Sequence, residues 1–401
     1  MPAKIAGAES SSVKRGDHAI MLGRQGAHQR PPIARKLRRL SPPQGTSFTE
    51  PGTSVPAAPD AQYGREFQMS IGSQPRFRLA TLPTPLQEAR RLREALGGPE
   101  RCPRILIKRD DLTGLAFGGN KARKLEFLVA DAIHQGSTVL ITTGAVQSNH
   151  ARMTAAAARL AGMRAALVLT SSTEQPEVQG NLLLDRLLDA EVHLLLPESG
   201  QTNDEAMEAI AEQLESDGER PYIIPGGGSN AIGAFGYVAG SLELAGQLFE
   251  MGVAPRRLYY ASGSRGTQAG LVLGAKLYGA SYEVYGVAVS PGTGDRSARA
   301  RTIIEHAADK LGTTVTLDSN DLIHDEGYVG EGYGIPTTAC LEAIRLLAQT
   351  EAIFLDPVYS GKAMSALIDH VRSGKLASND TVVFLHTGGN PALFAHGEHL
   401  L

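Results

Sequence analysis

Cysteine, net charge and long apolar runs are all scarce in this sequence of 401 residues. The two cysteines, Cys102 and Cys340, are too few for a disulfide framework and favour a reducing compartment, so we expect a cytoplasmic protein. The formal net charge of −3 offers no global field that would recruit nucleic acid or an acidic membrane. No apolar run approaches the roughly 18 residues that span a bilayer, and the N-terminus lacks the apolar core of a secretory signal. We therefore expect neither nucleic acid nor membrane as a partner.

Residues 1–68 differ in composition from the rest of the chain. They are rich in Ser, Pro, Gly, Gln and Arg, and carry ten basic against five acidic side chains, whereas the remainder has a net charge of −8. They show no hydrophobic periodicity and include the basic run Arg35–Arg39. Such a composition buries too little apolar surface to order itself, so we expect a disordered extension. The alternatives are an organelle-targeting or nucleic-acid tail, or a true start at Met69.

Beyond residue 68, short apolar runs alternate with helical patterns. Strands are predicted at Ile105–Lys108, Thr138–Thr142, Ala166–Leu169, Val192–Leu196, Tyr222–Ile224, Leu258–Ala261, Tyr282–Ala288 and Val382–Leu385. Helices are predicted at Lys121–Gln135, Asn149–Leu160, Asn181–Asp189, Asp204–Leu214, Gln268–Lys276, Thr338–Gln349 and Lys362–Arg372. This alternation predicts an α/β fold with parallel sheets covered by helices on both faces. So many strands in more than 300 residues indicate two such sheets with a cleft between them.

The segment Gly118–Phe127 places a lysine, Lys121, at the start of a predicted helix directly after Gly-Gly-Asn. Among apolar neighbours a lysine loses hydration and its amine pKa falls. A neutral amine attacks carbonyls, so Lys121 is a candidate to form an imine. The alternative is an ordinary loop lysine before an amphipathic helix.

Two further strand-to-helix turns could hold anions. The turn Gly144–His150 offers backbone N–H groups, with Ser148 and Asn149 as added donors, which suits a carboxylate; ordinary helix capping is the alternative. The turn Ser262–Gln268 has closely spaced glycines that let backbone amides converge on a phosphate, although a purely structural turn remains possible. A third glycine cluster, Gly226–Asn230, is a weaker candidate for phosphate and could be a hinge or a loop of the cleft.

Near the C-terminus, three loop motifs carry hydroxyl groups. Tyr333 lies between glycines before Pro336, Tyr359 precedes Ser360 and Gly361, and Thr387 follows a predicted strand and precedes two glycines. Tyrosines on such loops are accessible to a substrate, although packing with a local hydrogen bond is the alternative role. An imine-forming lysine, a phosphate turn, a carboxylate turn and loop hydroxyls together indicate a pyridoxal-phosphate enzyme that acts on amino acids.

Several motifs of the chain together resemble a known family. Spread from Pro75 to Phe394, they read KRDDLTGLAFGGNKARKLEF, GAVQSNHAR, GSRGTQAG, GEGYGIP, LDPVYSGKAM and FLHTGGNPALF. These motifs resemble those of the family of D-cysteine desulfhydrase and 1-aminocyclopropane-1-carboxylate deaminase, in the same order. That family belongs to the tryptophan-synthase-β-like pyridoxal-phosphate enzymes of fold type II.

The resemblance implies a role for each matching residue. Lys121 would carry the cofactor, pyridoxal 5′-phosphate, and Lys121, Ser148, Tyr333 and Tyr359 would be catalytic. The cofactor would also be held by Asn120, Asn149, Gly263, Ser264, Arg265, Gly266, Thr267, Ser360 and Thr387. The substrate would meet Ser148, Asn149, His150, Tyr333 and Tyr359. No metal is implied.

The resemblance also implies the organisation of the chain. Residues 69–123 and 231–401 would form a larger cofactor-binding domain built from both ends of the chain. A smaller domain would be inserted at 124–230, and the usual assembly is a homodimer.

Substrate choice within the family turns on a few positions. The deaminases carry glutamate where this chain has Ser360, leucine where it has Thr387 and glutamine where it has His150, so the pattern here is that of the desulfhydrases. A carboxylate beside the pyridine nitrogen favours its protonation, whereas neutral hydroxyls do not, which suits β-elimination with a good leaving group. We therefore expect elimination from D-cysteine to give pyruvate, ammonia and hydrogen sulfide.

Arg265 departs from the expected pattern, because a small residue is usual at this place in the phosphate turn. Its guanidinium could contact the phosphate, or it could point into the cleft and receive a second anion on the substrate. The second possibility favours an L-cysteate sulfo-lyase, a related activity that eliminates sulfite. Ring-opening deamination and a non-catalytic pyridoxal-phosphate carrier are weaker alternatives.

Overall fold

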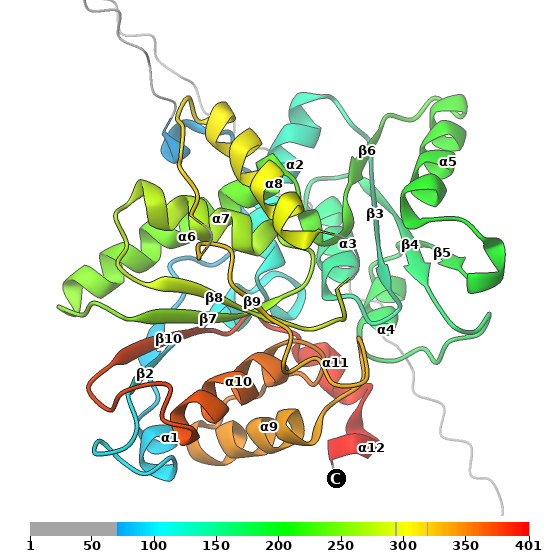
Figure 1. Ribbon diagram of the computed structural model, residues 1–401. Coiled ribbons are helices and arrows are strands. Elements are labelled where there is room, and N and C mark those ends of the chain that lie inside the picture. Colours follow the sequence, from blue (N-terminus) through cyan, green and yellow to red (C-terminus); the bar gives the residue numbers. More distant parts are fainter. Residues whose placement is uncertain (1–69, 293–294, 319, 401) are drawn as a thin grey trace, which may run out of the picture. The chain divides into compact units, whose positions relative to one another are not determined.

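The computed structural model describes residues 70–292, 295–318 and 320–400, so the predicted N-terminal extension lies outside the described residues. Within these ranges the strands form two sheets, one with six strands in the order β1-β2-β10-β7-β8-β9 and one with four in the order β5-β4-β3-β6 (Figure 1). The predicted α/β class with two sheets of mostly parallel strands is thereby confirmed.

The six-stranded sheet combines strands from both ends of the described chain. Its strands are β1 (Leu86–Glu88), β2 (Arg104–Lys108), β7 (Arg257–Ser262), β8 (Glu283–Ala288), β9 (His324–Asp325) and β10 (Thr381–Leu385). All neighbours are parallel except β1, which runs antiparallel to β2. Alternate residues of β7 point to opposite cores, Leu258 and Tyr260 to one and Tyr259 and Ala261 to the other, as expected for a sheet buried on both faces.

The four-stranded sheet is contiguous in sequence and fully parallel. Its strands are β3 (Val139–Ala145), β4 (Arg164–Thr170), β5 (Glu191–Leu195) and β6 (Pro221–Ile224). All four lie inside the segment 124–230 for which a smaller inserted domain is predicted; the division into domains itself stays a prediction.

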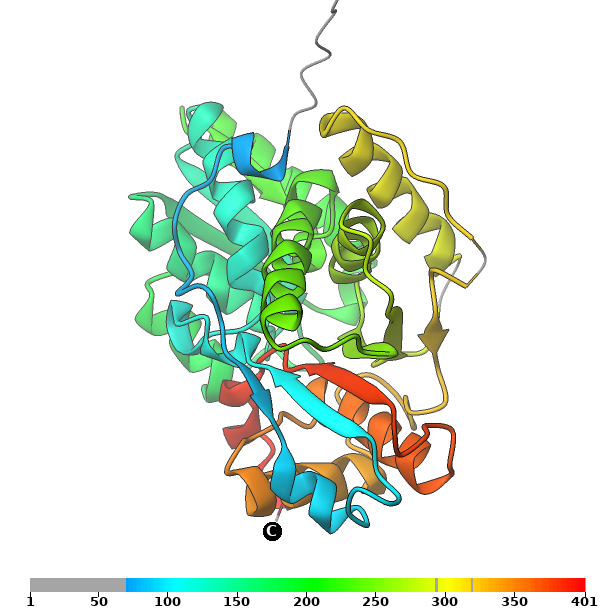
Figure 2. The same ribbon diagram turned by 90° about the vertical axis from the view of Figure 1, so that its left-hand side faces the viewer.

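Helices cover both faces of each sheet. They are α1 (Arg90–Ala95), α2 (Lys121–His134), α3 (Asn149–Leu160), α4 (Gly180–Leu187), α5 (Asn203–Ser216), α6 (Ala231–Glu250), α7 (Gly266–Leu277), α8 (Arg296–Lys310), α9 (Thr338–Glu351), α10 (Ser360–Arg372), α11 (Asn390–Phe394) and α12 (Gly397–Leu400). Figure 2 shows α6 and α7 in green on one face of the six-stranded sheet and α9 and α10 in orange on the other. On the smaller sheet, α2 and α3 pack on one face and α5 on the other.

Every strand and helix predicted above is present, with ends shifted by a few residues, but the long helices α6 and α8 were not predicted. The helix α6 contains Gly233, Gly236, Gly240 and Gly246, and glycine is a poor helix former. The reason for one of them is tertiary: a Cβ on Gly236 would lie 2.5 Å from the backbone carbonyl carbon of Arg123. Glycine therefore allows α6 to pack directly against the start of α2.

The order of the strands explains where loops converge. In the smaller sheet the chain moves outward from β3 to β4 and β5 and then returns to β6 on the other side of β3. In the larger sheet β8 and β9 follow β7 on one side, while β10 lies on the other. At such reversals the loops after neighbouring strands separate, and ligands bind at the carboxyl ends of the strands there.

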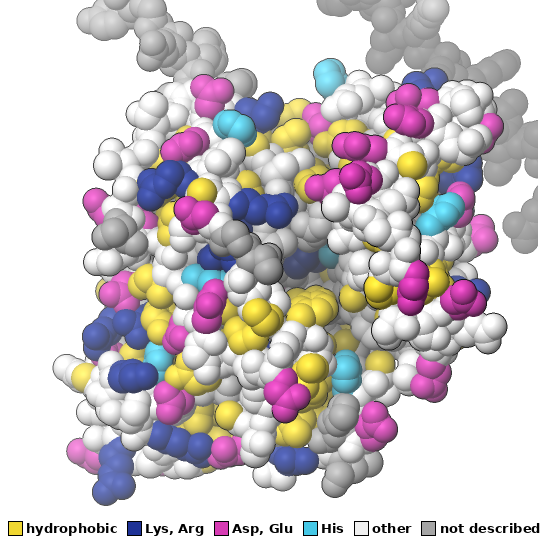
Figure 3. Space-filling view, turned by 45° about the vertical axis from the view of Figure 1, so that its right-hand side comes forward, with side chains coloured by type: hydrophobic (Ala, Val, Ile, Leu, Met, Phe, Trp, Pro, Cys, Tyr) yellow, Lys and Arg dark blue, Asp and Glu magenta, His cyan; other side chains and the backbone are white. Residues whose placement is uncertain are grey.

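The surface agrees with the balanced composition. Figure 3 shows acidic and basic side chains interspersed over one face of the molecule. Among the described residues, none of the helices combines the length and the apolar character that crossing a bilayer requires.

Candidate active site

A cavity of about 420 Å³ lies where the loops after strands of both sheets meet. It is lined by the ends of β3, β6, β7, β8 and β10 or the residues that follow them, together with the start of α2 and both predicted tyrosines. Of the predicted site residues it collects Asn120, Lys121, Ser148, Asn149, His150, Gly263, Ser264, Arg265, Thr267, Tyr333, Tyr359 and Thr387. Gly266 and Ser360 do not line it.

Lys121 is the first residue of α2, and the loop before it has an unusual backbone. Gly118 and Gly119 have φ of 72° and 129°, and a Cβ on Gly118 would lie 2.0 Å from the carbonyl oxygen of Asp111, so only glycine fits there. The Nζ of Lys121 donates to Oδ1 of Asn120 at 3.0 Å. Burial, assisted by the charge of Arg152, lowers the pKa of Lys121 to about 8, which confirms the predicted direction.

Asn120 is held by two long-range contacts. Its side-chain nitrogen donates to Oγ1 of Thr267 at 3.1 Å, and its backbone N–H donates to the carbonyl of Thr387 at 2.9 Å. Asn120 thus joins the start of α2 to the first turn of α7 and to the loop after β10.

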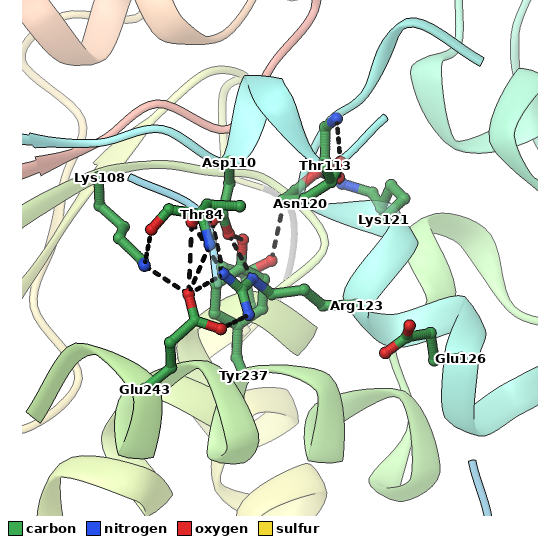
Figure 4. Close-up of polar contacts among 12 residues, drawn as sticks. Thr84, Lys108, Asp110, Thr113, Asn120, Lys121, Arg123, Glu126, Tyr237 and Glu243 are labelled. Atoms are coloured by element: carbon green, nitrogen blue, oxygen red, sulfur yellow. Dashed lines mark hydrogen bonds and ion pairs between the residues drawn. The ribbon is translucent and has the colours of Figure 1, made fainter. Parts of the chain in front are cut away.

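The first turn of α2 is anchored on its far side by a buried ion network. Arg123 donates to Asp110 at 2.8 Å and to Glu243 of α6 at 2.8 Å, and the hydroxyl of Tyr237 donates to Asp110 at 2.7 Å. Figure 4 shows Arg123 within this network, whereas Lys121 lies outside it, beside Asn120. Burial opposes the charge of Asp110, but Arg123 outweighs it and holds the pKa of that carboxyl below its ordinary value.

The turn between β3 and α3 is built as a helix cap. Ser148 is the N-cap residue, and its Oγ accepts from the backbone N–H of Ala151 at 3.2 Å. The free N–H groups of the first turn, together with the helix dipole, make this end of the cavity attractive for a carboxylate.

The amide of Asn149 is oriented by Asn181 of α4, a residue that the sequence motifs did not single out. The side-chain nitrogen of Asn181 donates to the backbone carbonyl of Gln147 at 2.9 Å and to Oδ1 of Asn149 at 3.1 Å. Since a backbone carbonyl can only accept, this pairing fixes which end of Asn181 faces Asn149. The Asn149 side chain, which lines the cavity, therefore has its NH₂ group left to donate to an oxygen.

His150 is neutral and turned toward the sheet. The hydroxyl of Thr142 donates to the carbonyl of Ile224 at 2.8 Å, so the 2.9 Å contact between Thr142 and Nε2 of His150 uses the imidazole N–H as donor. Burial, with Lys121 and Lys124 nearby, holds the pKa of His150 well below its ordinary value. A substrate contact by His150 stays a prediction.

The turn before α7 meets the glycine triplet after β6. Ser229 donates from its hydroxyl to Oγ of Ser264 at 2.7 Å and accepts from the N–H of Gly266 at 3.2 Å. A Cβ on Gly227 would lie 2.1 Å from that Ser264 oxygen. The two loops therefore face each other across a narrow space, and both Gly226 and Gly227 line the cavity.

Lys124 lies beside this pair of loops and was missed by the sequence analysis. It is buried, its Nζ donates to the carbonyl of Gly227 at 2.9 Å, and a Cβ on Gly266 would lie 2.9 Å from that Nζ. Burial, with Lys121 and Arg299 nearby, holds the pKa of Lys124 well below its ordinary value. Its position three residues after Lys121, on the same face of α2, is the signal that could have identified it.

Arg265 lies between Ser264 and Gly266 in the same turn. It is the N-cap residue of α7 with φ of 72°, is only 3 % exposed, and donates from Nη1 to Oε1 of Gln268 at 2.6 Å. Its Nε is buried without a hydrogen-bond partner among the described residues. Burial lowers the pKa of Arg265, and Arg296, which lines the same part of the cavity, contributes to that shift.

Tyr333 and Tyr359 form a pair on the wall of the cavity. Their hydroxyls are hydrogen-bonded to each other, and their rings meet edge to face with centroids 5.9 Å apart. Burial raises the pKa of both hydroxyls, so both stay protonated at neutral pH. The sequence prediction that these residues belong to one site agrees with this geometry, whereas their catalytic role stays a prediction.

Ser360 follows Tyr359 but faces away from the cavity. Its hydroxyl donates to Oδ1 of Asp356 at 2.6 Å, and the same carboxylate accepts the backbone N–H groups of Val358, Tyr359 and Ser360. Thr387, by contrast, lines the cavity.

The comparisons with known proteins point to one family. The family model described as "Pyridoxal-phosphate dependent enzyme" matches residues 77–388. D-cysteine desulfhydrases of Salmonella choleraesuis (strain SC-B67) and Salmonella paratyphi C (strain RKS4594) are 42% and 41% identical over 330 residues, covering 81% of this chain and 97% of each relative.

Among solved structures, a crystal structure described as an ACC deaminase homologue is 37% identical, with a TM-score of 0.74 over 82% of this chain and 96% of that one. The processed form of threonine deaminase isoform 2 from Solanum lycopersicum is 18% identical, with a TM-score of 0.55 over 80% of this chain and 83% of that one, and shares the fold alone. The resemblance found in the sequence motifs is thus confirmed, together with the cofactor that names the family. The chain belongs to the family of pyridoxal-phosphate-dependent enzymes.

Proposed function

We propose that the protein catalyses β-elimination on D-cysteine, in which D-cysteine and water yield pyruvate, ammonia and hydrogen sulfide. The observation that carries this proposal is the half-buried, pKa-lowered amine of Lys121 in a cavity that also holds a capped helix N-terminus and two paired tyrosines. The 42% identical relative named D-cysteine desulfhydrase supports the choice of substrate.

The residues present fit the cofactor. Lys121 offers a nucleophilic amine, and the turn before α7 and the glycine triplet offer backbone N–H groups and hydroxyls for a phosphate. Lys124 offers an amine that the charge of a bound phosphate would keep protonated. The free NH₂ group of Asn149 suits a ring oxygen. When bound, pyridoxal phosphate supplies the electron sink that stabilises negative charge at the substrate's Cα.

The chain's own residues would bind the substrate and move its protons. The N-terminus of α3 and Ser148 hold the substrate carboxylate. The amine of Lys121, with a pKa of about 8, can take the proton from Cα as a general base. The hydroxyls of Tyr333 and Tyr359, protonated at neutral pH, can donate to the departing sulfur.

Elimination is favoured over ring-opening deamination by the side chains near Thr387. A hydroxyl lines the cavity at Thr387, and the nearby Asp356 carboxylate is already satisfied by three backbone N–H groups and Ser360. Neither position presents a free carboxylate that would favour a protonated cofactor ring.

Elimination of sulfite from L-cysteate is the second candidate, and Arg265 favours it. A buried guanidinium with an unpartnered Nε on the cavity wall is suited to a second anion, and Arg296 and Arg299 line the same region. The sulfonate of L-cysteate would supply that anion.

A turnover panel separates these activities. The purified, cofactor-loaded protein is incubated with D-cysteine, L-cysteate and 1-aminocyclopropane-1-carboxylate, and the release of sulfide, sulfite and 2-oxobutanoate is measured. We expect sulfide from D-cysteine to dominate, and none of the products from Lys121→Ala. Sulfite as the main product would replace the first proposal with the second.

We further propose a homodimer in a reducing, cytoplasmic compartment. The family resemblance supports the dimer, and the two buried, unpaired cysteines support the compartment. Sedimentation of the purified protein tests the assembly, and a monomer would contradict it.

A further inference from the structure

Lys362 is a fully buried lysine of α10 outside the cavity. Its Nζ donates to the carbonyl of Val329 at 2.7 Å and to the carbonyl of Gly332 at 2.8 Å. Burying an ammonium or amine group lowers the stability of the fold unless the group is hydrogen-bonded. The two bonds of Lys362 offset this penalty, which raises the question of what a lysine contributes at this position.

Both acceptors belong to the connection between β9 and α9, which carries Tyr333. This connection contains Gly330, Gly332 and Gly334, and its residues 330–336 form neither helix nor strand. Among the described residues, the backbone N–H groups of this stretch donate no hydrogen bond to another backbone group. The bond from Lys362 to Gly332 is therefore the principal polar restraint on the residue next to Tyr333.

The same lysine stands one helical turn after Tyr359. Tyr359 is the N-cap residue of α10, and its position is fixed by the contacts of Asp356 with the start of that helix. Lys362 thus reaches from the helix that holds Tyr359 to the loop that holds Tyr333, whose hydroxyls are bonded to each other.

We propose that Lys362 is a positioning residue that clamps the Tyr333 loop onto α10 and so sets the alignment of the Tyr333–Tyr359 pair. This inference rests on the proposed function, in which the two hydroxyls act on the leaving group. A tyrosine displaced by about an ångström would lose much of its contribution, although substrate and cofactor still bind.

The test compares Lys362→Met, which keeps most of the length of the side chain but has no donor, with Lys362→Arg, which keeps donors. The matched control is Lys108→Met, because Lys108 is a similarly buried lysine whose Nζ bonds to Thr84, Glu243 and Gln247, in a different part of the structure. For each cofactor-loaded variant, kcat and KM for D-cysteine, the cofactor absorbance and the melting temperature are measured. Hydrogen exchange of residues 330–336 is followed with and without the cofactor.

For Lys362→Met we expect kcat to fall about tenfold to a hundredfold while KM changes by less than about threefold. Exchange in 330–336 should accelerate, the cofactor absorbance should persist, and Lys362→Arg should recover part of kcat. Lys108→Met should lower the melting temperature without changing exchange in 330–336 or the kcat of the folded enzyme.

Unchanged exchange in 330–336 of Lys362→Met, or an equal loss of kcat in Lys108→Met, would overturn the proposal. If Lys362→Met does not fold, Lys362→Gln, which is shorter and uncharged, is judged by the same measurements. If the wild-type protein releases no sulfide, the proposed function fails, whereas the exchange measurements still decide whether Lys362 restrains the loop.

Discussion

The two sides of the first turn of α2 hold buried charges in opposite ways. On the side of Arg123, cations and carboxylates are paired, and although burial lowers the pKa of Arg123, Asp110 and Glu243 outweigh it and raise that pKa. On the cavity side, Lys121 and Lys124 donate only to the neutral oxygens of Asn120 and Gly227, and both pKa values are lowered. The side of Arg123 therefore stabilises the fold, whereas the side of Lys121 and Lys124 is suited to bind an anionic ligand with a carbonyl group.

Among substitutions on these two sides of α2, Lys121→Ala should have the largest effect on activity. We expect loss of the absorbance of the lysine-linked cofactor and a fall in kcat of at least about a thousandfold, because the attachment point and the general base disappear together. Stability of the cofactor-free protein should not fall, since a poorly partnered buried cation is removed. Retained absorbance would show that another residue holds the cofactor.

The substitution Arg123→Met tests how much the paired charges on the other side of α2 stabilise the fold. It leaves Asp110 buried without its cationic partner, while the half-buried Glu243 keeps Lys108, and it should lower the free energy of unfolding by about 3–5 kcal/mol. The control is Arg164→Met, which removes ion pairs that are solvent-exposed and should cost about 0–1 kcal/mol. Urea unfolding measures both, and equal effects would show that burial of the network contributes nothing.

Lys124→Met sharpens the assignment of the phosphate site. Loss of one charge-assisted contact should weaken cofactor binding by about tenfold to a hundredfold. The stability of the cofactor-free protein should stay constant or rise. Titration with pyridoxal phosphate gives the dissociation constant, and an unchanged value would place the phosphate elsewhere.

The pKa of Lys121 gives the mildest test, because only the pH is changed. Its lowered value of about 8 means that the neutral, nucleophilic form is scarce at pH 6 and increases as the pH rises. The rate at which cofactor-free protein links to pyridoxal phosphate should therefore rise about tenfold per pH unit and level off above pH 8. Stopped-flow absorbance measures it, and a rise that continues to pH 10 would contradict the lowered pKa.

Much of the cavity could be predicted because its parts are local. The turns at Ser148 and Ser264 follow strands and open helices, and glycine, serine and asparagine at such turns mark anion sites whatever the rest of the chain does. The direction of the pKa shift of Lys121 was expected from desolvation, to which the fold adds the charge of Arg152.

Other features were beyond the sequence because they depend on partners far along the chain. The glycines of α6 suggested no helix, and the reason for one of them, Gly236, is the approach of α2. Ser360 was expected at the cofactor, but its hydroxyl is bonded to Asp356 and lies outside the cavity lining. Lys124 and Lys362 looked like ordinary helical lysines until their carbonyl acceptors in distant loops were known.

The sequence by itself determined the alternation of strands and helices, the lysine, the anion-binding turns and the family. Only the tertiary structure decided which buried charges are paired, which hydroxyls face the cavity and how the Tyr333 loop is held. The physical reason is that backbone conformation and helix ends depend on neighbouring residues, whereas desolvation and the choice of hydrogen-bond partner depend on groups brought together by folding.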